Sequence, residues 1–189
     1  MDKERFELDH ALGIAEGLIA RLRPACVPGF ILLAGSARRL APDVGDVEIV
    51  YVSLVERGPS KDDFFKDEPI NRVDEIIADL FQSRVLDKRK NVNGNETFGP
   101  WNKLMRHVAT RIPVDLFATK PECFWNYMVC RTGPTGNNVA IANAAIAKGW
   151  KWNPYGEGFT DNEGNVRRVT SEREVFELVG LPYREPWDR

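Results

Sequence analysis

The chain has 189 residues, of which 43% are hydrophobic and 29% are charged, so it can build one ordinary core beneath a polar surface. Its 26 basic and 28 acidic residues give a formal net charge of −2, which excludes a protein that binds nucleic acid through bulk positive charge. No apolar run approaches the roughly 20 residues of a membrane span or forms a signal-peptide core, so the sequence predicts an intracellular protein, in the cytoplasm or nucleoid, that is not secreted.

The first part of the chain alternates predicted helices and strands. Apolar residues recur at intervals of three and four from Leu8 to Leu22, which predicts a helix that Pro24 ends. The continuous apolar run Phe30–Ala34 and the β-branched run Val47–Val52 predict two buried strands. The pattern then predicts a charged loop over 56–68, a helix over 70–81, a polar loop over 91–100 and strands near 103–109 and 112–118.

Helical signals dominate the rest of the chain. Thr119-Lys120-Pro121-Glu122 has the spacing of a capping box and predicts a helix that ends at Thr132-Gly133, before a second helix over 134–148. The same spacing recurs in Ser171–Glu174, ahead of a third short helix. The expected fold class is α+β: a mixed β-sheet with helices on one side over residues 1–120, followed by a small, mainly helical subdomain over 121–189.

The residues that carry chemistry lie in the sheet region. Gly35-Ser36 follows a buried strand, and Asp46 and Glu48 are two residues apart, which places both carboxylates on one face at the start of the next strand. Asp115 interrupts an apolar strand, where a carboxylate is costly to bury without a cation or hydrogen bonds. Oxygen ligands of this kind suit Mg²⁺, and two ions require a carboxylate that bridges them. Each feature alone is also typical of an ordinary turn or a solvent-facing strand.

These residues resemble the Gly-Ser-x-Arg-Arg and Gly-Asp-x-Asp signature of family X DNA polymerases, the DNA polymerase beta-like nucleotidyltransferases. The matching segments are Gly35-Ser36-Ala37-Arg38-Arg39 and Gly45-Asp46-Val47-Glu48-Ile49, in the spacing of the family. Thr132-Gly133 with Asn138, and later Leu181–Pro186, are similar to the palm-to-thumb junction and carboxy-terminal subdomain of the same family. The resemblance implies a minimal form with a palm over 1–120 and a thumb over 121–189.

The resemblance also implies a reaction and its metal ions. The reaction is the transfer of a nucleoside monophosphate from a (d)NTP to a primer 3′-hydroxyl, with release of pyrophosphate. Asp46, Glu48 and Asp115 would hold two Mg²⁺ ions, for which Mn²⁺ can substitute, and Glu48 or Asp115 would accept the proton. One ion would lower the pKa of the attacking hydroxyl, and the other would stabilise the leaving pyrophosphate.

The nucleotide contacts follow from the same resemblance. Ser36 and Arg39 would bind the triphosphate, the arginine through charge-assisted hydrogen bonds, while Gly35 would permit close backbone approach. Thr132-Gly133 would lie under the incoming sugar, and Asn138 would reach the minor-groove edge of the incoming base. The full set expected to bind the nucleotide is Gly35, Ser36, Arg39, Gly45, Thr132, Gly133 and Asn138.

Several positions depart from the pattern of the family. Glu48 stands where the polymerases usually have aspartate, which moves the carboxylate by one methylene. Cys130-Arg131 replaces an aromatic pair near the sugar, which predicts weaker discrimination against ribonucleotides. Ala142 replaces an arginine that touches the template, which puts template-directed fidelity in doubt. Pro113 replaces an arginine before the third acid, and Arg111 is the candidate to substitute for it.

Gap filling in DNA repair by a monomer is the setting that these features favour. The chain begins at the palm helix, so the expectation includes no amino-terminal lyase activity. DNA would be gripped by the thumb and by the basic stretch 84–111, weakly and with a steep salt dependence. Two alternatives stay open: an untemplated nucleotidyltransferase acting on RNA, protein or a small molecule, and an inactive nucleotide or nucleic-acid binder.

Overall fold

A five-stranded mixed sheet forms the centre of the first lobe in the computed structural model, which describes residues 4–59 and 67–189. The strand order is β2-β4-β9-β8-β7, in which β4 and β9 run parallel and all other neighbours run antiparallel. The central pair is rich in β-branched and other apolar residues, because a central parallel pair is buried on both faces. The bounds are Cys26–Ala34 (β2), Val47–Ser53 (β4), Leu86–Lys88 (β7), Asn102–His107 (β8) and Pro113–Ala118 (β9).

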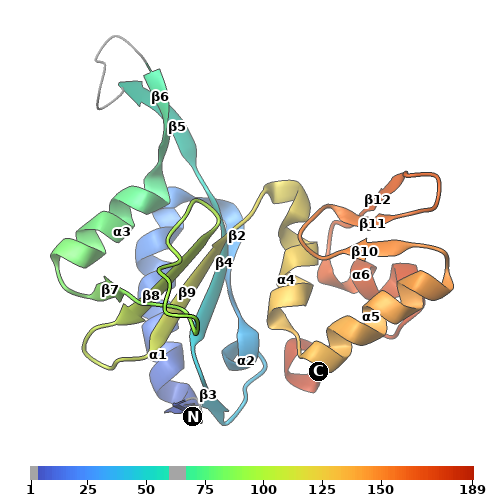
Figure 1. The fold of residues 1–189 in the computed structure, drawn as a ribbon, viewed down its shortest axis with the longest axis horizontal. Coiled ribbons are helices and arrows are strands. Elements are labelled where there is room, and N and C mark those ends of the chain that lie inside the picture. Colours follow the sequence, from blue (N-terminus) through green and yellow to red (C-terminus); the bar gives the residue numbers. More distant parts are fainter. Residues whose placement is uncertain (1–3, 60–66) are drawn as a thin grey trace.

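Two helices cover one face of this sheet, α1 (Leu8–Leu22) and α3 (Arg72–Gln82) (Figure 1). The predicted helix 8–22 is confirmed, and its buried residues are those that the three- and four-residue spacing selects: Ala11, Ala15, Leu18 and Leu22. The helix predicted over 70–81 is also confirmed, with its start shifted by two residues. The Asn71 side chain sets that start, because it accepts hydrogen bonds from the N–H groups of Val73 and Asp74 at 3.1 and 3.3 Å.

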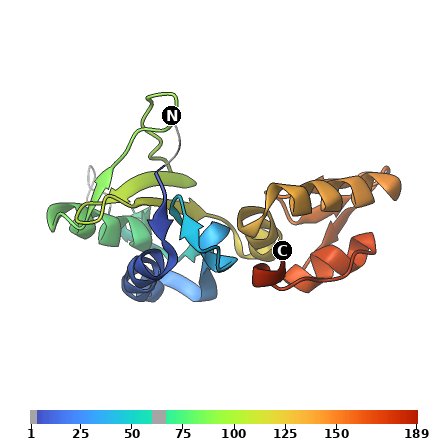
Figure 2. The same cartoon turned by 90° about the horizontal axis from the view of Figure 1, so that it is seen from below.

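The opposite face of the sheet is turned toward the carboxy-terminal lobe. Val50, Val52 and Phe117 lie on it and pack against α4 (Phe124–Thr132) through buried residues that include Phe124 and Met128. Successive residues of a strand point to opposite faces, so Glu48 and Asp115 share this face with Val50 and Phe117. The sheet therefore presents its acidic side chains to the side on which the second lobe stands (Figure 2).

Beyond α4, the second lobe contains two helices, which the sequence predicted, and a small sheet, which it did not. The helices are α5 (Thr135–Ala147) and α6 (Glu172–Val179), and the antiparallel strands are β10 (Lys151–Asn153), β11 (Gly158–Thr160) and β12 (Val166–Arg168). Its core includes Ile141, Trp152, Phe159 and Phe176. Three residues per strand are too few for an apolar alternation, which explains why the expectation of a mainly helical subdomain missed the sheet.

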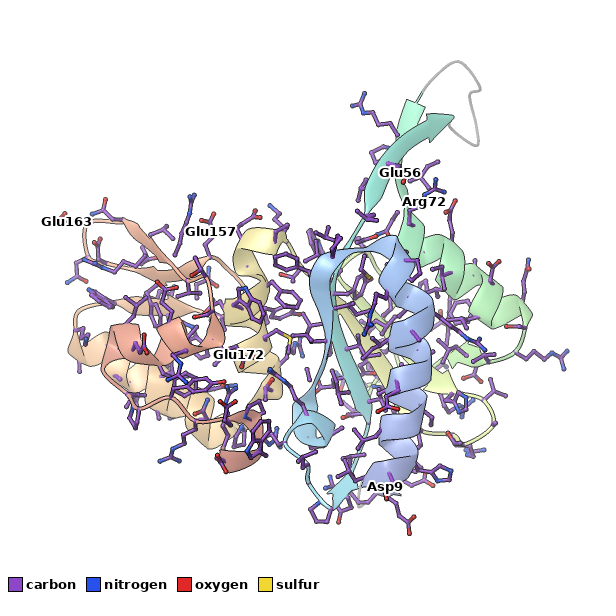
Figure 3. The ribbon with its side chains drawn as sticks, turned by 180° about the vertical axis from the view of Figure 1, so that it is seen from behind. Asp9, Glu56, Arg72, Glu157, Glu163 and Glu172 are labelled. Atoms are coloured by element: carbon purple, nitrogen blue, oxygen red, sulfur yellow. The ribbon has the colours of Figure 1, made fainter. Side chains whose placement is uncertain are left out.

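The loop predicted over 56–68 is wrong at both ends. β5 (Val55–Pro59) and β6 (Asp67–Asn71) pair as an antiparallel hairpin that projects from the first lobe, and residues 60–66 lie outside the described chain (Figure 1). Figure 3 places Glu56 and Arg72 at the base of this hairpin, where their side chains form an ion pair at 2.5 Å. No described residue of β5 or β6 belongs to a hydrophobic core cluster, so the hairpin carries no core-facing alternation and its sequence is typical of a loop.

One of the two predicted capping boxes is confirmed. Ser171 accepts a hydrogen bond from the N–H of Glu174 at 3.2 Å and so begins α6. The Thr119 box is wrong, because a 3₁₀ turn over Pro121–Cys123 precedes α4, which begins without a side-chain cap. The remaining elements are β1 (Phe6–Glu7), 3₁₀ turns at Arg23–Ala25 and Pro186–Asp188, α2 (Gly35–Arg38) and β3 (Asp43–Val44). Among the described residues, no helix has the length and apolarity needed to cross a bilayer.

Cys26 opens β2 and provides a test of the core. Its side chain is buried, and burial raises the pKa of its thiol from 9.0 to about 12. Between these values the unfolded chain loses the thiol proton while the folded chain keeps it, so the contribution of Cys26 to stability is complete below pH 9 and falls as pH rises. We expect Cys26→Ala to flatten the decline in unfolding free energy above pH 9, measured by urea titration. An unchanged slope would contradict this.

Candidate active site

Glu48 and Asp115 lie side by side on the sheet. The parallel pairing of β4 and β9 places their Cα atoms in register, and Asp46 precedes β4 at the same parity as Glu48. The prediction that acids from neighbouring strands share one face therefore agrees with the register. Asp115 is 7% exposed, so its carboxylate depends on the groups around it for compensation.

The donor chemistry of this pair suits a divalent cation. The predicted trio Asp46, Glu48 and Asp115 is not gathered into a metal-binding cage, since among residues 4–59 and 67–189 no three histidine, cysteine or acidic side chains lie closely enough to enclose a metal ion. Mg²⁺ does not require such a cage, since it keeps several waters and is usually bound by one or two carboxylates together with the phosphates of a substrate. Glu48 and Asp115 therefore fit the protein half of a metal–nucleotide site.

Arg89 provides the positive charge that Asp115 meets in the folded chain. Its Nη2 donates to Oδ1 and Oδ2 of Asp115 at 2.6 and 2.8 Å, from the segment just after β7. Arg111, the candidate from the sequence, is exposed in the turn before β9, with φ of 64°. Arg89, and not Arg111, is therefore the arginine that pairs with Asp115, from the segment after the edge strand β7.

The Gly35-Ser36 motif begins where β2 ends beside Glu48. Ala34 pairs with Glu48 across the two strands, and the next residue, Gly35, has φ of +67°. A Cβ atom at this position would collide with the Glu48 carboxylate. The glycine thus gives the turn a left-handed conformation and leaves room for a carboxylate against the backbone.

Gly35→Ala tests this close approach. We expect a loss of about 1–2 kcal/mol in unfolding free energy from the left-handed strain, together with displacement of Glu48 and reduced activity. Chemical unfolding and metal titration would measure the two effects. Gly13→Ala, at an open position inside α1 where a Cβ meets nothing within 4 Å, is the matched control: it is expected to keep its metal affinity and to gain stability, since alanine is favoured over glycine in a helix interior. Full metal affinity in Gly35→Ala would contradict the contact.

Arg39 connects the motif to the second lobe. Its Nη1 donates a hydrogen bond to the carbonyl oxygen of Thr132, at the last residue of α4. Burial lowers the pKa of Arg39 and the charge of Glu48 acts to raise it, so this guanidinium and that carboxylate interact. Gly133 follows with φ of 62° and ends the helix, so the chain can turn toward α5.

A cavity of about 370 Å³ lies where these parts meet. Five of the ten predicted site residues line it, and they come from α2, β4, the end of α4 and α5: Arg39, Glu48, Thr132, Gly133 and Asn138. The other five, Gly35, Ser36, Gly45, Asp46 and Asp115, are not in its lining, although Gly35 touches Glu48 and Asp115 is its strand neighbour. The structure thus brings the carboxylate, guanidinium and amide parts of the predicted site to one hollow.

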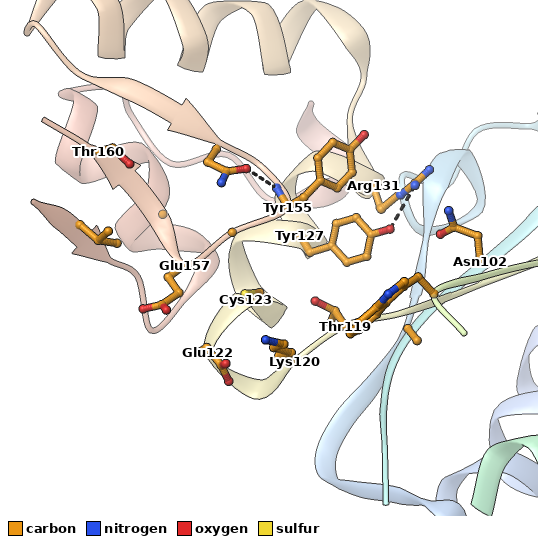
Figure 4. Close-up of a pocket in the computed structure, with 16 residues that line it drawn as sticks. Asn102, Thr119, Lys120, Glu122, Cys123, Tyr127, Arg131, Tyr155, Glu157 and Thr160 are labelled. Carbon is orange, nitrogen blue, oxygen red and sulfur yellow. Dashed lines mark hydrogen bonds between the residues drawn. The ribbon is translucent and has the colours of Figure 1, made fainter. Parts of the chain in front are cut away.

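Asn138 and Arg131 form the wall of this cavity on the side of the second lobe. Asn138 donates from Nδ2 to the carbonyl of Cys130 at 2.8 Å, and its buried Oδ1 has no partner among the described residues. Arg131 stacks its guanidinium on Phe117, with 3.6 Å from Cζ to the ring centroid, and donates to the Tyr127 hydroxyl at 3.1 Å. Figure 4 shows this side chain reaching toward the first lobe beside a second cavity, of about 620 Å³. Arg131 therefore lines both cavities, as does Tyr155.

A buried ion cluster joins the lobes behind the site. Glu172, at the start of α6, accepts from Arg38 at 2.5 Å and from Arg189 at 2.8 Å, and Arg38 also donates to the Thr132 hydroxyl at 2.8 Å. Figure 3 shows Glu172 at the end of α6 nearest the first lobe. No local sequence pattern points to these contacts. Arg38 and Glu172 are 134 residues apart, Glu172 and Arg189 are 17 apart, and Arg89 and Asp115 are 26 apart.

Comparisons with known proteins agree with this architecture. Residues 127–189 match the DNA polymerase beta thumb family. The polymerase beta of Leishmania infantum in a ternary P/T complex has a similar fold, with a TM-score of 0.72, 21% identity and coverage of 98% of this chain and 77% of that one. The ternary gap complex of the same polymerase gives a TM-score of 0.72 and 20% identity, and the match covers 98% of this chain and 71% of that one. No curated protein sequence matches the chain. At these identities the structural likeness establishes the fold.

Proposed function

We propose that this chain, which has a family X polymerase-like fold and a DNA polymerase beta-type thumb sequence over 127–189, is a DNA-directed nucleotidyltransferase that fills gaps in DNA. The single observation that carries the proposal is the cavity between the lobes, where Glu48 of the sheet faces Arg39, Thr132 and Asn138. We place the palm in residues 1–120 and the thumb in 121–189. The solved relatives are complexes named for primer–template-type and gapped forms, which supports DNA as the partner.

Each residue receives a role from its position. Asp46, Glu48 and Asp115 would hold divalent cations, two Mg²⁺ ions or Mn²⁺ in their place, which supply Lewis-acid stabilisation of the triphosphate and of the attacking hydroxyl. Arg39 and Ser36 bind the triphosphate from the α2 turn, with Gly35 and Gly45 allowing the backbone to come close. Arg89 holds the Asp115 carboxylate in its orientation. Glu48 or Asp115 accepts the proton of the primer hydroxyl.

The thumb side fixes the nucleoside. Thr132 and Gly133 lie beneath the sugar, and the unpartnered Oδ1 of Asn138 lines the cavity as an acceptor for the incoming nucleoside. Cys130 and Arg131 stand at the sugar side without an aromatic pair, which supports use of both deoxy- and ribonucleotides. Arg131 is held by Phe117 and Tyr127, so its charge is fixed beside the site.

Untemplated transfer is the second candidate, and Ala142 favours it. Ala142 lies on α5 and packs against the core of the second lobe, so at this position no long side chain extends to a template strand. The net charge of −2 also favours weak DNA binding, with affinity that falls steeply as salt rises.

Primer extension on a duplex with a one-nucleotide gap separates these functions. Each dNTP is supplied alone with Mg²⁺ or Mn²⁺, at low and moderate salt. We expect addition of the complementary nucleotide only, and stronger activity at low salt. Equal addition of all four nucleotides would establish untemplated transfer. If no nucleotide is added on gapped, primed or single-stranded DNA, the proposal of DNA polymerisation is contradicted. Nucleotide binding without turnover would then indicate a nucleotide-binding protein without transferase activity.

A further inference from the structure

A third, smaller cavity lies in the second lobe and shares Pro134 with the proposed nucleotide cavity. Its volume is about 220 Å³, and it lies between the start of α5, Phe176 of α6 and the carboxy-terminal segment with Arg184 and Arg189. Within residues 4–59 and 67–189, only Pro134 lines both cavities. The volume is below the roughly 300 Å³ at which pockets for drug-sized ligands begin, so the space suits a small ion.

Two nitrogens at this cavity lack partners. The side chain of Arg189 is 0% exposed, its Nη2 and Nε donate to Glu172 and to the carbonyl of Arg184, and its Nη1 has no partner among the described residues. The Nδ2 of Asn137 is also buried without a partner there. A buried N–H group without an acceptor costs free energy, so both groups favour an acceptor that enters the cavity.

The side-chain charges that line the cavity also favour an anion. Glu172 is one carboxylate shared by two guanidiniums, Arg38 and Arg189, which leaves this buried cluster with an excess positive charge. Arg184 adds a second cation to the lining, which contains no acidic residue within the described chain. The charge of Arg189 also contributes to lowering the pKa of Arg39, so it acts on a residue of the proposed nucleotide site.

The start of α5 contributes further donors. The helix has 13 residues, no acidic residue in its first turn and no side chain that caps its first N–H groups. Gly136 and Asn137 of this turn line the cavity. The positive end of the helix dipole and free N–H groups favour an anion at this place.

We propose that this cavity binds a phosphoryl oxyanion: a free phosphate or pyrophosphate ion, or a phosphodiester of a nucleic-acid backbone. The Arg189 Nη1, the Asn137 amide and the first turn of α5 donate to it, and Arg184 adds charge from the edge. The site is separate from the triphosphate contacts of Arg39 and Ser36 and does not depend on nucleotidyl transfer.

Titration of the metal-free and nucleotide-free protein tests the site. Inorganic phosphate, pyrophosphate and a short single-stranded oligonucleotide are added in separate calorimetric titrations in a low-salt buffer without oxyanions. We expect saturable 1:1 binding of at least one of them, and the strongest ligand identifies the source of the oxyanion. Arg39→Ala is expected to retain this binding, which separates the site from the proposed nucleotide contacts. Absence of binding by all three probes would overturn the proposal.

Two variants on α5 complete the test. Gly136→Asp places a carboxylate where an added Cβ meets nothing within 4 Å, so we expect an unchanged or higher melting temperature and at least about tenfold weaker binding. Asn137→Ala is expected to weaken binding several-fold, whereas Asn143→Ala, on the exposed side of the same helix, is expected to retain it. Full binding in a folded Gly136→Asp variant would overturn the assignment to this cavity.

Discussion

Asp115→Asn is expected to lower the rate of nucleotidyl transfer about a thousandfold, because it removes a negative ligand worth several kcal/mol in the transition state. The asparagine has nearly the same shape and keeps one oxygen that accepts from Arg89, so the variant is expected to fold, with a melting temperature lowered by its weaker pairing with Arg89. Arg89 donates from Nη2 to both oxygens of Asp115, at 2.6 and 2.8 Å, and its buried charge loses compensation in the variant. The remaining rate would come from binding and from the other carboxylates.

Single-turnover extension of the gapped duplex at saturating Mg²⁺ measures this effect. Asp79→Asn, an exposed acid of α3 on the far side of the sheet, is the matched control and is expected to extend at the normal rate. Thermal unfolding of both variants separates a catalytic loss from a folding defect. A folded Asp115→Asn chain with a rate within tenfold of the unsubstituted protein would remove Asp115 from the proposed metal site.

The sequence alone predicts that the Asp115 carboxylate needs a compensating group, but it does not predict which residue provides it. An acid in an apolar strand requires compensation, and that physical argument needs no knowledge of the fold. The identity of the compensating group requires the strand order, because Arg89 follows the edge strand β7 and lies 26 residues away in sequence. A three-residue strand such as β7 has no periodicity of its own, so sequence patterns missed both the strand and its arginine.

The same reasoning explains which parts of the fold were predictable. α1 and the central strand β4 are long and buried along a regular stripe or face, so their composition records the packing. The strands β10, β11 and β12 are held by pairing with one another and by the core around Trp152 and Phe159, which the local sequence does not record. In the candidate site, the sequence motifs predicted residues of which five line the cavity, whereas the stacking of Arg131 on Phe117 depends on how α4 meets the sheet.

The ion cluster between the lobes is the strongest example of such long-range dependence, and its removal has the largest expected effect on stability. Glu172→Ala is expected to lower the unfolding free energy by about 3–5 kcal/mol, because it leaves the guanidiniums of Arg38 and Arg189 buried without their carboxylate. Arg38 lies in the Gly35–Arg39 motif that we propose binds the nucleotide, so the variant is also expected to loosen the contact between the α2 turn and Thr132.

Urea unfolding of Glu172→Ala measures this cost, with Glu177→Ala as the control on an exposed position of the same helix. The triple variant Arg38→Met, Glu172→Met and Arg189→Met is expected to recover most of the loss, since replacing a whole buried ion cluster by apolar side chains is far less costly than removing one partner. Recovery would establish that unpaired charge, and not lost packing, destabilises Glu172→Ala. A change below about 1 kcal/mol in Glu172→Ala would show that the cluster is open to solvent and that the lobes are held by the apolar contacts of α4 with the sheet.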